Sequence, residues 1–107
     1  MKLKKICVIG LGYIGLPTAA ILANQGYEVA GIDIDEQIVQ KINQGSIHIA
    51  EPDLAAAVNS AVNSGRLKAF TTPQLSDIYI ICVPTPLQKK TKIPQPNLEY
   101  VFDGGYA

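Results

Sequence analysis

The sequence has few of the residues that build metal centres and disulfide frameworks. Its 107 residues include only two cysteines, Cys7 and Cys82, and one histidine, His48, with no CxxC pair and no cluster of cysteine and histidine. We therefore expect neither a disulfide framework nor a metal site. Both cysteines fall in stretches that we expect to be buried strands, which indicates a reducing, cytoplasmic environment.

Charge is also scarce. Charged residues make up 17% of the chain, and the formal net charge is zero at pH 7. A neutral chain has no overall electrostatic attraction to nucleic acid or to an anionic membrane. No apolar segment is long enough to span a bilayer, and the short apolar run after the N-terminal lysines is interrupted by glycines, unlike a signal peptide. We expect no nucleic acid and no membrane as partners.

Apolar residues, in contrast, are plentiful. They make up 48% of the sequence, which is enough to build a core and is not typical of a disordered chain. The length suits one domain, so we assign residues 1–107 to a single unit.

The most informative stretch is the segment GLGYIG at residues 10–15. It follows an apolar, partly β-branched run at residues 6–9 and precedes a helical pattern at residues 13–25. In a dinucleotide-binding G-x-G-x-x-G motif, Gly10 would allow the sharp turn, Gly12 the close approach of a pyrophosphate, and Gly15 tight packing of helix on strand. The first amides of the helix would form an anion site. The alternative is a strand–turn–helix that binds no ligand.

Asp33 supports the cofactor interpretation. It ends a predicted second strand at residues 28–33 and lies 18 residues after Gly15, close to the spacing of the acid that binds the ribose hydroxyls of NAD. Its alternative role is the N-cap of the next helix, but Asp35 is better placed for that.

The remaining pattern predicts three helices and two further strands. The first helix carries an apolar stripe of Ile14, Ile21 and Leu22, while its alanines at positions 19, 20 and 23 are expected to allow close packing on the sheet. The other helices are expected at residues 35–44 and from Pro52 to Gly65. A short, edge-like strand is expected at residues 66–70. We interpret His48 as a structural or solvated loop residue and not a catalytic one.

A continuous apolar run at residues 78–83 predicts a buried parallel strand that is covered on both faces. It leads into Pro84 at the carboxyl edge of the sheet, where ligands of open α/β sheets bind. The prolines alone would explain a stiff loop here. Because the glycines lie at the same edge, we favour cofactor contact for Val83 and Thr85. The lysine-rich loop at residues 88–92 is expected to be solvated, with a phosphate contact as the alternative, and a short capped helix is expected to start at Asn97.

This order of elements predicts an α/β fold, a Rossmann-like parallel sheet with strand order 3-2-1-4 and helices on both faces. It corresponds to the N-terminal portion of such a domain only. The sequence contains no constellation of catalytic residues, so we assign none.

Four motifs in this order resemble the UDP-glucose/GDP-mannose dehydrogenase family. They are VIGLGYIGLP at residues 8–17, GIDID at 31–35, INQG at 42–45 with EPDL at 51–54, and ICVPTP at 81–86. The segment from His48 to Leu54 is similar to the branch that oxidises UDP-N-acetylmannosamine or UDP-N-acetylglucosamine at C6.

The resemblance implies the cofactor and its ligands. The cofactor would be NAD, with its pyrophosphate held by Gly10, Gly12, Tyr13, Ile14 and Gly15. Asp33 would bind the adenosine ribose, and Val83 to Thr85 would lie on the nicotinamide side.

The resemblance also implies the activity. A nucleotide sugar would be oxidised to the uronic acid by a homo-oligomeric parent protein, an NAD-dependent oxidoreductase. The family's catalytic cysteine and lysine lie in regions beyond residue 107, so we expect this chain alone to be inactive. Its end, where residues 102–107 depart from the family's helix, is compatible with an engineered boundary, a frameshifted gene or a natural truncation.

Two other functions fit part of the pattern. A non-enzymatic nucleotide sensor of the kind that gates transporters also uses the glycines and the acid, but it does not account for the segment CVPTP at residues 82–86 or for Glu51-Pro52. A remnant of a dinucleotide domain that binds nothing is the third possibility.

Overall fold

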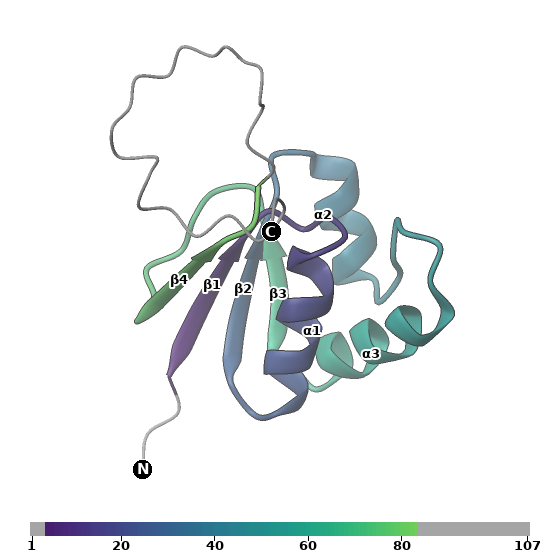
Figure 1. Ribbon diagram of the computed structural model, residues 1–107, viewed down its shortest axis with the longest axis horizontal. Coiled ribbons are helices and arrows are strands. Elements are labelled where there is room, and N and C mark those ends of the chain that lie inside the picture. Colours follow the sequence, from purple (N-terminus) through teal and green to yellow (C-terminus); the bar gives the residue numbers. More distant parts are fainter. Residues whose placement is uncertain (1–3, 84–107) are drawn as a thin grey trace.

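A computed structural model describes residues 4–83. Four strands form one parallel sheet in the order β3-β2-β1-β4, as predicted. Figure 1 shows this sheet and its helices. In chain order the elements are β1 (Lys5–Ile9), α1 (Gly15–Asn24), β2 (Glu28–Ile32), α2 (Glu36–Asn43), α3 (Pro52–Asn63), β3 (Leu67–Phe70) and β4 (Ile78–Ile81).

The register of the strands brings three connections to one edge of the sheet. Ile9, at the end of β1, lies opposite Ile32 of β2 and Ile81 of β4. The residues that follow these strands are therefore neighbours, although they come from widely separated parts of the chain. They are the glycine loop (residues 10–15), the turn at residues 33–35, and Cys82 with Val83.

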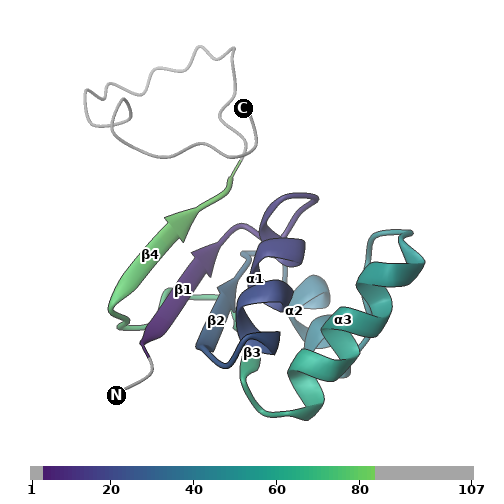
Figure 2. The ribbon, with the colours of Figure 1, turned by 60° about the horizontal axis from the view of Figure 1, so that its bottom comes forward.

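All three helices pack on the same face of the sheet within the described residues, which corrects the expectation of helices on both faces (Figure 2). The core cluster on that face includes Val8 of β1, Val29 of β2, and residues of all three helices. The smaller cluster on the other face, formed by Cys7, Ala30 and Ile32 with Ile9 and Phe70, contains no helical residue. The reason is chiral: the crossovers from β1 to β2 and from β2 to β3 step in the same direction, and right-handed crossovers then place their helices on the same side.

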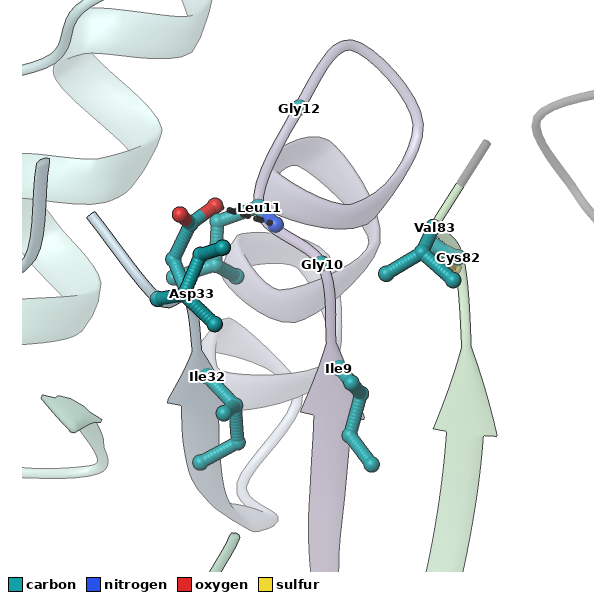
Figure 3. A pocket seen from close by; sticks show the side chains of 9 residues that line it. Ile9, Gly10, Leu11, Gly12, Ile32, Asp33, Cys82 and Val83 are labelled. Carbon is teal, nitrogen blue, oxygen red and sulfur yellow. Dashed lines mark hydrogen bonds between the residues drawn. The ribbon is translucent and has the colours of Figure 1, made fainter. Parts of the chain in front are cut away.

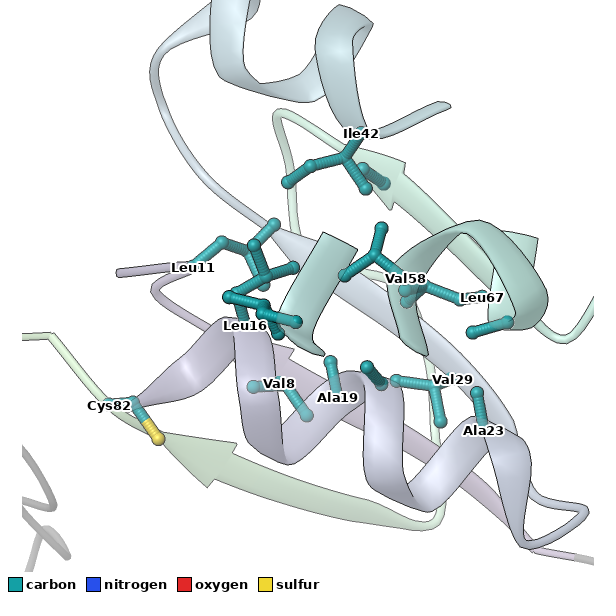
Figure 4. Packing of buried hydrophobic residues seen from close by; sticks show 14 of the residues in the cluster. Val8, Leu11, Leu16, Ala19, Ala23, Val29, Ile42, Val58, Leu67 and Cys82 are labelled. Carbon is teal, nitrogen blue, oxygen red and sulfur yellow. The ribbon is translucent and has the colours of Figure 1, made fainter. Parts of the chain in front are cut away.

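Small side chains allow α1 to lie close to the sheet. Its buried residues are Gly15, Leu16, Ala19, Ala20 and Ala23, several of which appear in Figure 4. The predicted stripe is wrong in part, because Ile14 and Ile21 are 44% and 56% exposed. The expectation that Ala19, Ala20 and Ala23 allow close packing on the sheet is confirmed, because all three are buried. The helix also begins at Gly15, two residues later than predicted.

The other helix boundaries follow local signals. Asp35 is the N-cap of α2, and its Oδ1 accepts a hydrogen bond from the Gln37 amide at 2.9 Å, as predicted. Pro52 is the first residue of α3, where its missing N–H costs nothing. None of the helices in residues 4–83 is long and apolar enough to cross a membrane.

The prediction of a strongly buried β4 is wrong. Ile78 and Tyr79 are 40% and 46% exposed, and the strand ends at Ile81. Within the described residues β4 is an edge strand that pairs only with β1. An edge strand lacks one neighbour, so its apolar side chains stay partly in solvent.

Candidate cofactor site

A pocket of about 320 Å³ lies at the carboxyl edge of the sheet, where β1, β2 and β4 end (Figure 3). It is the position at which open α/β sheets bind ligands. Its lining residues share that edge: Ile9, Gly10, Leu11, Gly12, Ile32, Asp33, Ile34, Cys82 and Val83. Asp33 is the single charged residue among them.

Gly10 and Gly15 have structural reasons to be glycine. Gly10 adopts φ +100°, which L side chains rarely adopt, and a Cβ there would meet Val83 at 2.9 Å. A Cβ on Gly15 would overlap the carbonyl oxygen of Gly10. The turn and the tight packing of helix on strand that the spacing predicts are therefore present.

Gly12 has no such structural reason. Its φ is not positive, and a Cβ built on it meets no atom within 4 Å. In the described part of the chain, the amides of Gly12, Tyr13 and Ile14 have no hydrogen-bond acceptor. The first turn of α1 carries no acidic residue, and no side chain caps it. These N–H groups at the positive end of a helix match the needs of a phosphate group.

Asp33, which follows β2, lines the same pocket beside the glycine loop. Its Oδ2 accepts from the Leu11 amide at 3.3 Å and its Oδ1 from the Asp35 amide at 3.0 Å. An ionised carboxylate has about four acceptor positions, so about two remain for a pair of hydroxyl groups. The carboxylate both fixes the glycine loop and keeps acceptor capacity towards the pocket.

Leu11 was not identified from the sequence as a site residue. Its side chain is 1% exposed and packs against Gly31, where a Cβ would lie 3.0 Å from Leu11 Cδ2. The missing side chain of Gly31 therefore makes room for Leu11, which anchors the glycine loop on β2. A glycine inside a strand often marks such a close approach, so the position of Gly31 in the predicted second strand could have indicated this contact.

The structure brings together part of the predicted site. Gly10, Gly12, Asp33 and Val83 line the pocket. Tyr13, Ile14 and Gly15 do not, although they belong to the same loop, and Tyr13 lines a neighbouring hollow beside α3.

Other predicted features fall elsewhere. Thr85, the lysine-rich loop at residues 88–92 and the helix expected at Asn97 lie outside the described residues. His48 is partly buried in the connection between α2 and α3 and does not line this pocket. Both cysteines are buried, as predicted.

The fold and the pocket together define a dinucleotide-binding α/β domain of the Rossmann type. The chain matches the model of the "UDP-glucose/GDP-mannose dehydrogenase family, NAD binding domain" over residues 4–104. It therefore belongs to the UDP-glucose/GDP-mannose dehydrogenase family, as its NAD-binding domain.

Similar proteins support this membership. The UDP-N-acetyl-D-mannosamine dehydrogenase of Campylobacter jejuni is 52% identical over 100 residues, which are 94% of this chain and 24% of that protein. The NDP-N-acetyl-D-galactosaminuronic acid dehydrogenase of Ralstonia nicotianae is 50% identical over 98 residues, or 92% and 22%. The solved structure of the UDP-N-acetyl-mannosamine dehydrogenase of Staphylococcus aureus superimposes with a TM-score of 0.74 and 49% identity, covering 77% of this chain and 20% of that one. This chain thus spans about a quarter of the length of the curated relatives it matches.

Proposed function

We propose that this chain is the NAD-binding part of a nucleotide-sugar 6-dehydrogenase. The parent protein would oxidise a UDP-N-acetylhexosamine to the uronic acid, with UDP-N-acetylmannosamine favoured. The sugar is inferred from the names of relatives and from the similarity of residues 48–54 to one branch of the family. The Ralstonia relative is named for a different sugar, although its sequence identity to this chain is nearly the same as that of the Campylobacter relative. The choice of sugar therefore has less support than the choice of cofactor.

Gly12 is the observation that carries the cofactor role. Neither packing nor backbone conformation requires a glycine there, yet a side chain would extend into open space beside three amides without acceptors. A ligand with a phosphate group accounts for both facts, because it would occupy that space and accept those hydrogen bonds.

Each part of the site has a role in this proposal. The glycine loop, with Gly12, Tyr13 and Ile14 donating from their backbones, would hold the pyrophosphate. Asp33 would accept from the adenosine ribose hydroxyls. Val83, which lines the pocket at the end of β4, would lie on the nicotinamide side, together with Thr85.

When bound, NAD supplies the acceptor for the hydride that leaves the sugar alcohol. The contribution of this chain is to bind and orient the cofactor. Acid formation needs a nucleophile, and neither cysteine suits that role, because Cys7 is fully buried and Cys82 is 5% exposed. The nucleophile and the sugar site would belong to the parent protein.

Two measurements test this proposal. Calorimetric titration of the 107-residue chain with NAD should show weak, saturable binding. An assay with UDP-N-acetylmannosamine and NAD should show no steady formation of NADH. Steady NADH formation that survives Cys7→Ser and Cys82→Ser would show that the catalytic groups are in this chain, and the absence of NAD binding would favour a remnant without a ligand.

The sequence that follows codon 107 in the gene gives a third test. A downstream cysteine in a loop and an inward-facing lysine would support the dehydrogenase. An intact reading frame that leads instead into a transport or regulatory domain would support the nucleotide sensor.

A further inference from the structure

Asn43, the last residue of α2, makes two side-chain hydrogen bonds to the backbone of β3. Its side-chain Nδ2 donates to the Ala69 carbonyl at 3.0 Å, and its Oδ1 accepts from the Ala69 amide at 2.8 Å. Asn43 itself is exposed, whereas Ala69 is buried. The proposed function gives no role to Asn43, although it belongs to the INQG motif.

The two bonds reproduce the pairing that a neighbouring strand would supply. The carbonyls of Arg66 and Phe70 accept from amides on the β2 side, from Val29 and Asp33 respectively. Because alternate residues of a strand turn their backbone groups to opposite sides, Ala69 faces away from β2. Asn43 thus satisfies the donor and the acceptor of Ala69 at the edge of the sheet, where the described residues provide no strand.

The Asn43–Ala69 hydrogen bonds lie one residue from Phe70, whose carbonyl binds the backbone of Asp33. The Phe70 carbonyl accepts from the Asp33 amide at 3.1 Å, directly after Ala69 in the chain. On its other side Asp33 is tied to the start of α2, because its Oδ1 accepts from the amide of Asp35, the N-cap residue. The far end of α2 then returns to β3 through Asn43.

These contacts form a closed ring that runs from Asp33 through α2 to Asn43, and from there through β3 back to Asp33. Ile42, fully buried beside Asn43, and Val39 hold α2 against the core, so the position of Asn43 is well defined. Asn43 is the member of the ring that joins the end of α2 to β3 by side-chain hydrogen bonds.

We infer that Asn43 is a positioning residue for the Asp33 carboxylate and hence for the ribose half of the cofactor site. This inference rests on the proposed function, since it assigns a purpose to the position of Asp33. Without the Asn43 amide, the end of β3 is held less firmly, and the Asp33 amide loses a fixed acceptor. The carboxylate then spends less time in the geometry that receives a ribose diol.

Asn24 offers a matched control. It is the last residue of α1, it is exposed, and its side chain also makes two hydrogen bonds, to the Ala57 carbonyl at 3.0 Å and from Ser60 Oγ at 3.2 Å. Those bonds join α1 to α3 and do not involve β3 or Asp33. Asn43→Ala and Asn24→Ala therefore remove comparable contacts from different places.

The test compares NAD affinity in the two variants. Asn43→Ala is expected to weaken NAD binding on the order of tenfold, about the effect of one lost hydrogen bond, and Asn24→Ala to leave it within about twofold. In an Asp33→Ala background, Asn43→Ala should cause no further loss. Equal losses in both Asn variants, or a full loss from Asn43→Ala on top of Asp33→Ala, would overturn the inference.

Amide hydrogen exchange, measured by NMR without any cofactor, separates this inference from the proposed function. Asn43→Ala should accelerate exchange of the Ala69 and Asp33 amides and leave the Val8 amide in the middle of β1 unchanged. Asn43→Asp keeps an oxygen that can accept from the Ala69 amide but places a negatively charged oxygen against the Ala69 carbonyl, so it should accelerate exchange of the same two amides, and it serves if the alanine variant does not fold. Unchanged exchange at Asp33 would refute the positioning role. Accelerated exchange together with an Asp33→Ala variant that binds NAD normally would instead refute the ribose role of Asp33.

Discussion

Asp33 Oδ2 accepts a hydrogen bond from the Leu11 amide at 3.3 Å, joining the end of β2 to the first turn of the glycine loop. The same carboxylate is the proposed ligand of the adenosine ribose. In the proposed complex, one group would thus both hold the glycine loop, on the pyrophosphate side, and bind the ribose. A change at Asp33 is therefore expected to affect both halves of the adenosine site.

The first prediction is a preference for NAD over NADP of at least about tenfold in dissociation constant, or about 1.4 kcal/mol. A carboxylate can accept from free ribose hydroxyls but repels a 2′-phosphate. Ile34, 90% exposed next to Asp33, supplies no positive charge, and none of the described residues that line the pocket is basic. Parallel titrations with both cofactors measure the ratio.

The matched variant for this prediction is Asp33→Ala. It should weaken NAD binding, because the carboxylate that accepts from the ribose hydroxyls is lost. It should also reduce the discrimination between the two cofactors, because the same carboxylate no longer repels the 2′-phosphate of NADP. Equal or tighter binding of NADP by the unaltered chain would contradict the role given to Asp33.

The second prediction separates binding from folding at Gly12. Gly12→Val should lower NAD affinity by at least about tenfold, since a branched side chain would occupy the space proposed for the pyrophosphate. It should leave the circular dichroism spectrum and the thermal midpoint nearly unchanged, because a Cβ at Gly12 meets nothing within 4 Å.

Gly15→Ala is the contrasting variant. Its methyl group would overlap the Gly10 carbonyl oxygen, so it should destabilise the fold by at least about 1–3 kcal/mol. If Gly12→Val unfolds the chain as Gly15→Ala does, the role of Gly12 is structural, and the cofactor interpretation of the loop loses its main support.

The third prediction concerns the contact between Gly31 and Leu11. Gly31→Val should cost about 1–3 kcal/mol of unfolding free energy, because Leu11 is buried and has little room to move. Leu11→Ala alone should cost about 2–5 kcal/mol. The double variant restores the volume, so its loss should be smaller than the sum of the two. Strictly additive losses in chemical denaturation would show that the two side-chain positions do not share the space.

The fourth prediction is self-association through β4. Within residues 4–83 no strand pairs with the outer edge of β4, and its Ile78 and Tyr79 are both partly exposed. An unprotected apolar edge tends to pair with another chain. Ile78→Lys should lower the weight-average mass in sedimentation at high protein concentration. Leu75→Lys, which adds the same charge at a position 88% exposed but outside the strand, should not. If the unaltered chain stays monomeric at every protein concentration, this edge is not an association surface.

Much of the fold was predictable from local signals. The strand order follows from parallel strands with right-handed crossovers, and Asp35 and Pro52 mark the starts of α2 and α3 by chemistry that acts within one helical turn. The glycine spacing, Asp33 and the end of the apolar run at residues 78–83 predicted four residues that line the pocket. The expectation of helices on both faces was wrong, although the predicted strand order with right-handed crossovers already implies a single face for these helices. The burial of β4 was mispredicted because it depended on neighbours that a short stretch does not reveal. The apolar run of β4 reads the same in a central strand and in an edge strand, because composition does not say how many partners a strand has.

The sequence by itself determined the class of fold, the glycine loop and the acid that faces it, since each depends on residues close in the chain and on general rules of backbone geometry. Only the tertiary structure decided that Leu11 fits over Gly31 and that Asn43 binds the outer edge of β3 beside Asp33. Leu11 and Gly31 are 20 residues apart in the chain, and Asn43 and Ala69 are 26 apart. Such contacts arise when the sheet brings distant segments together, and their geometry depends on distances of a few tenths of an ångström that no sequence pattern encodes.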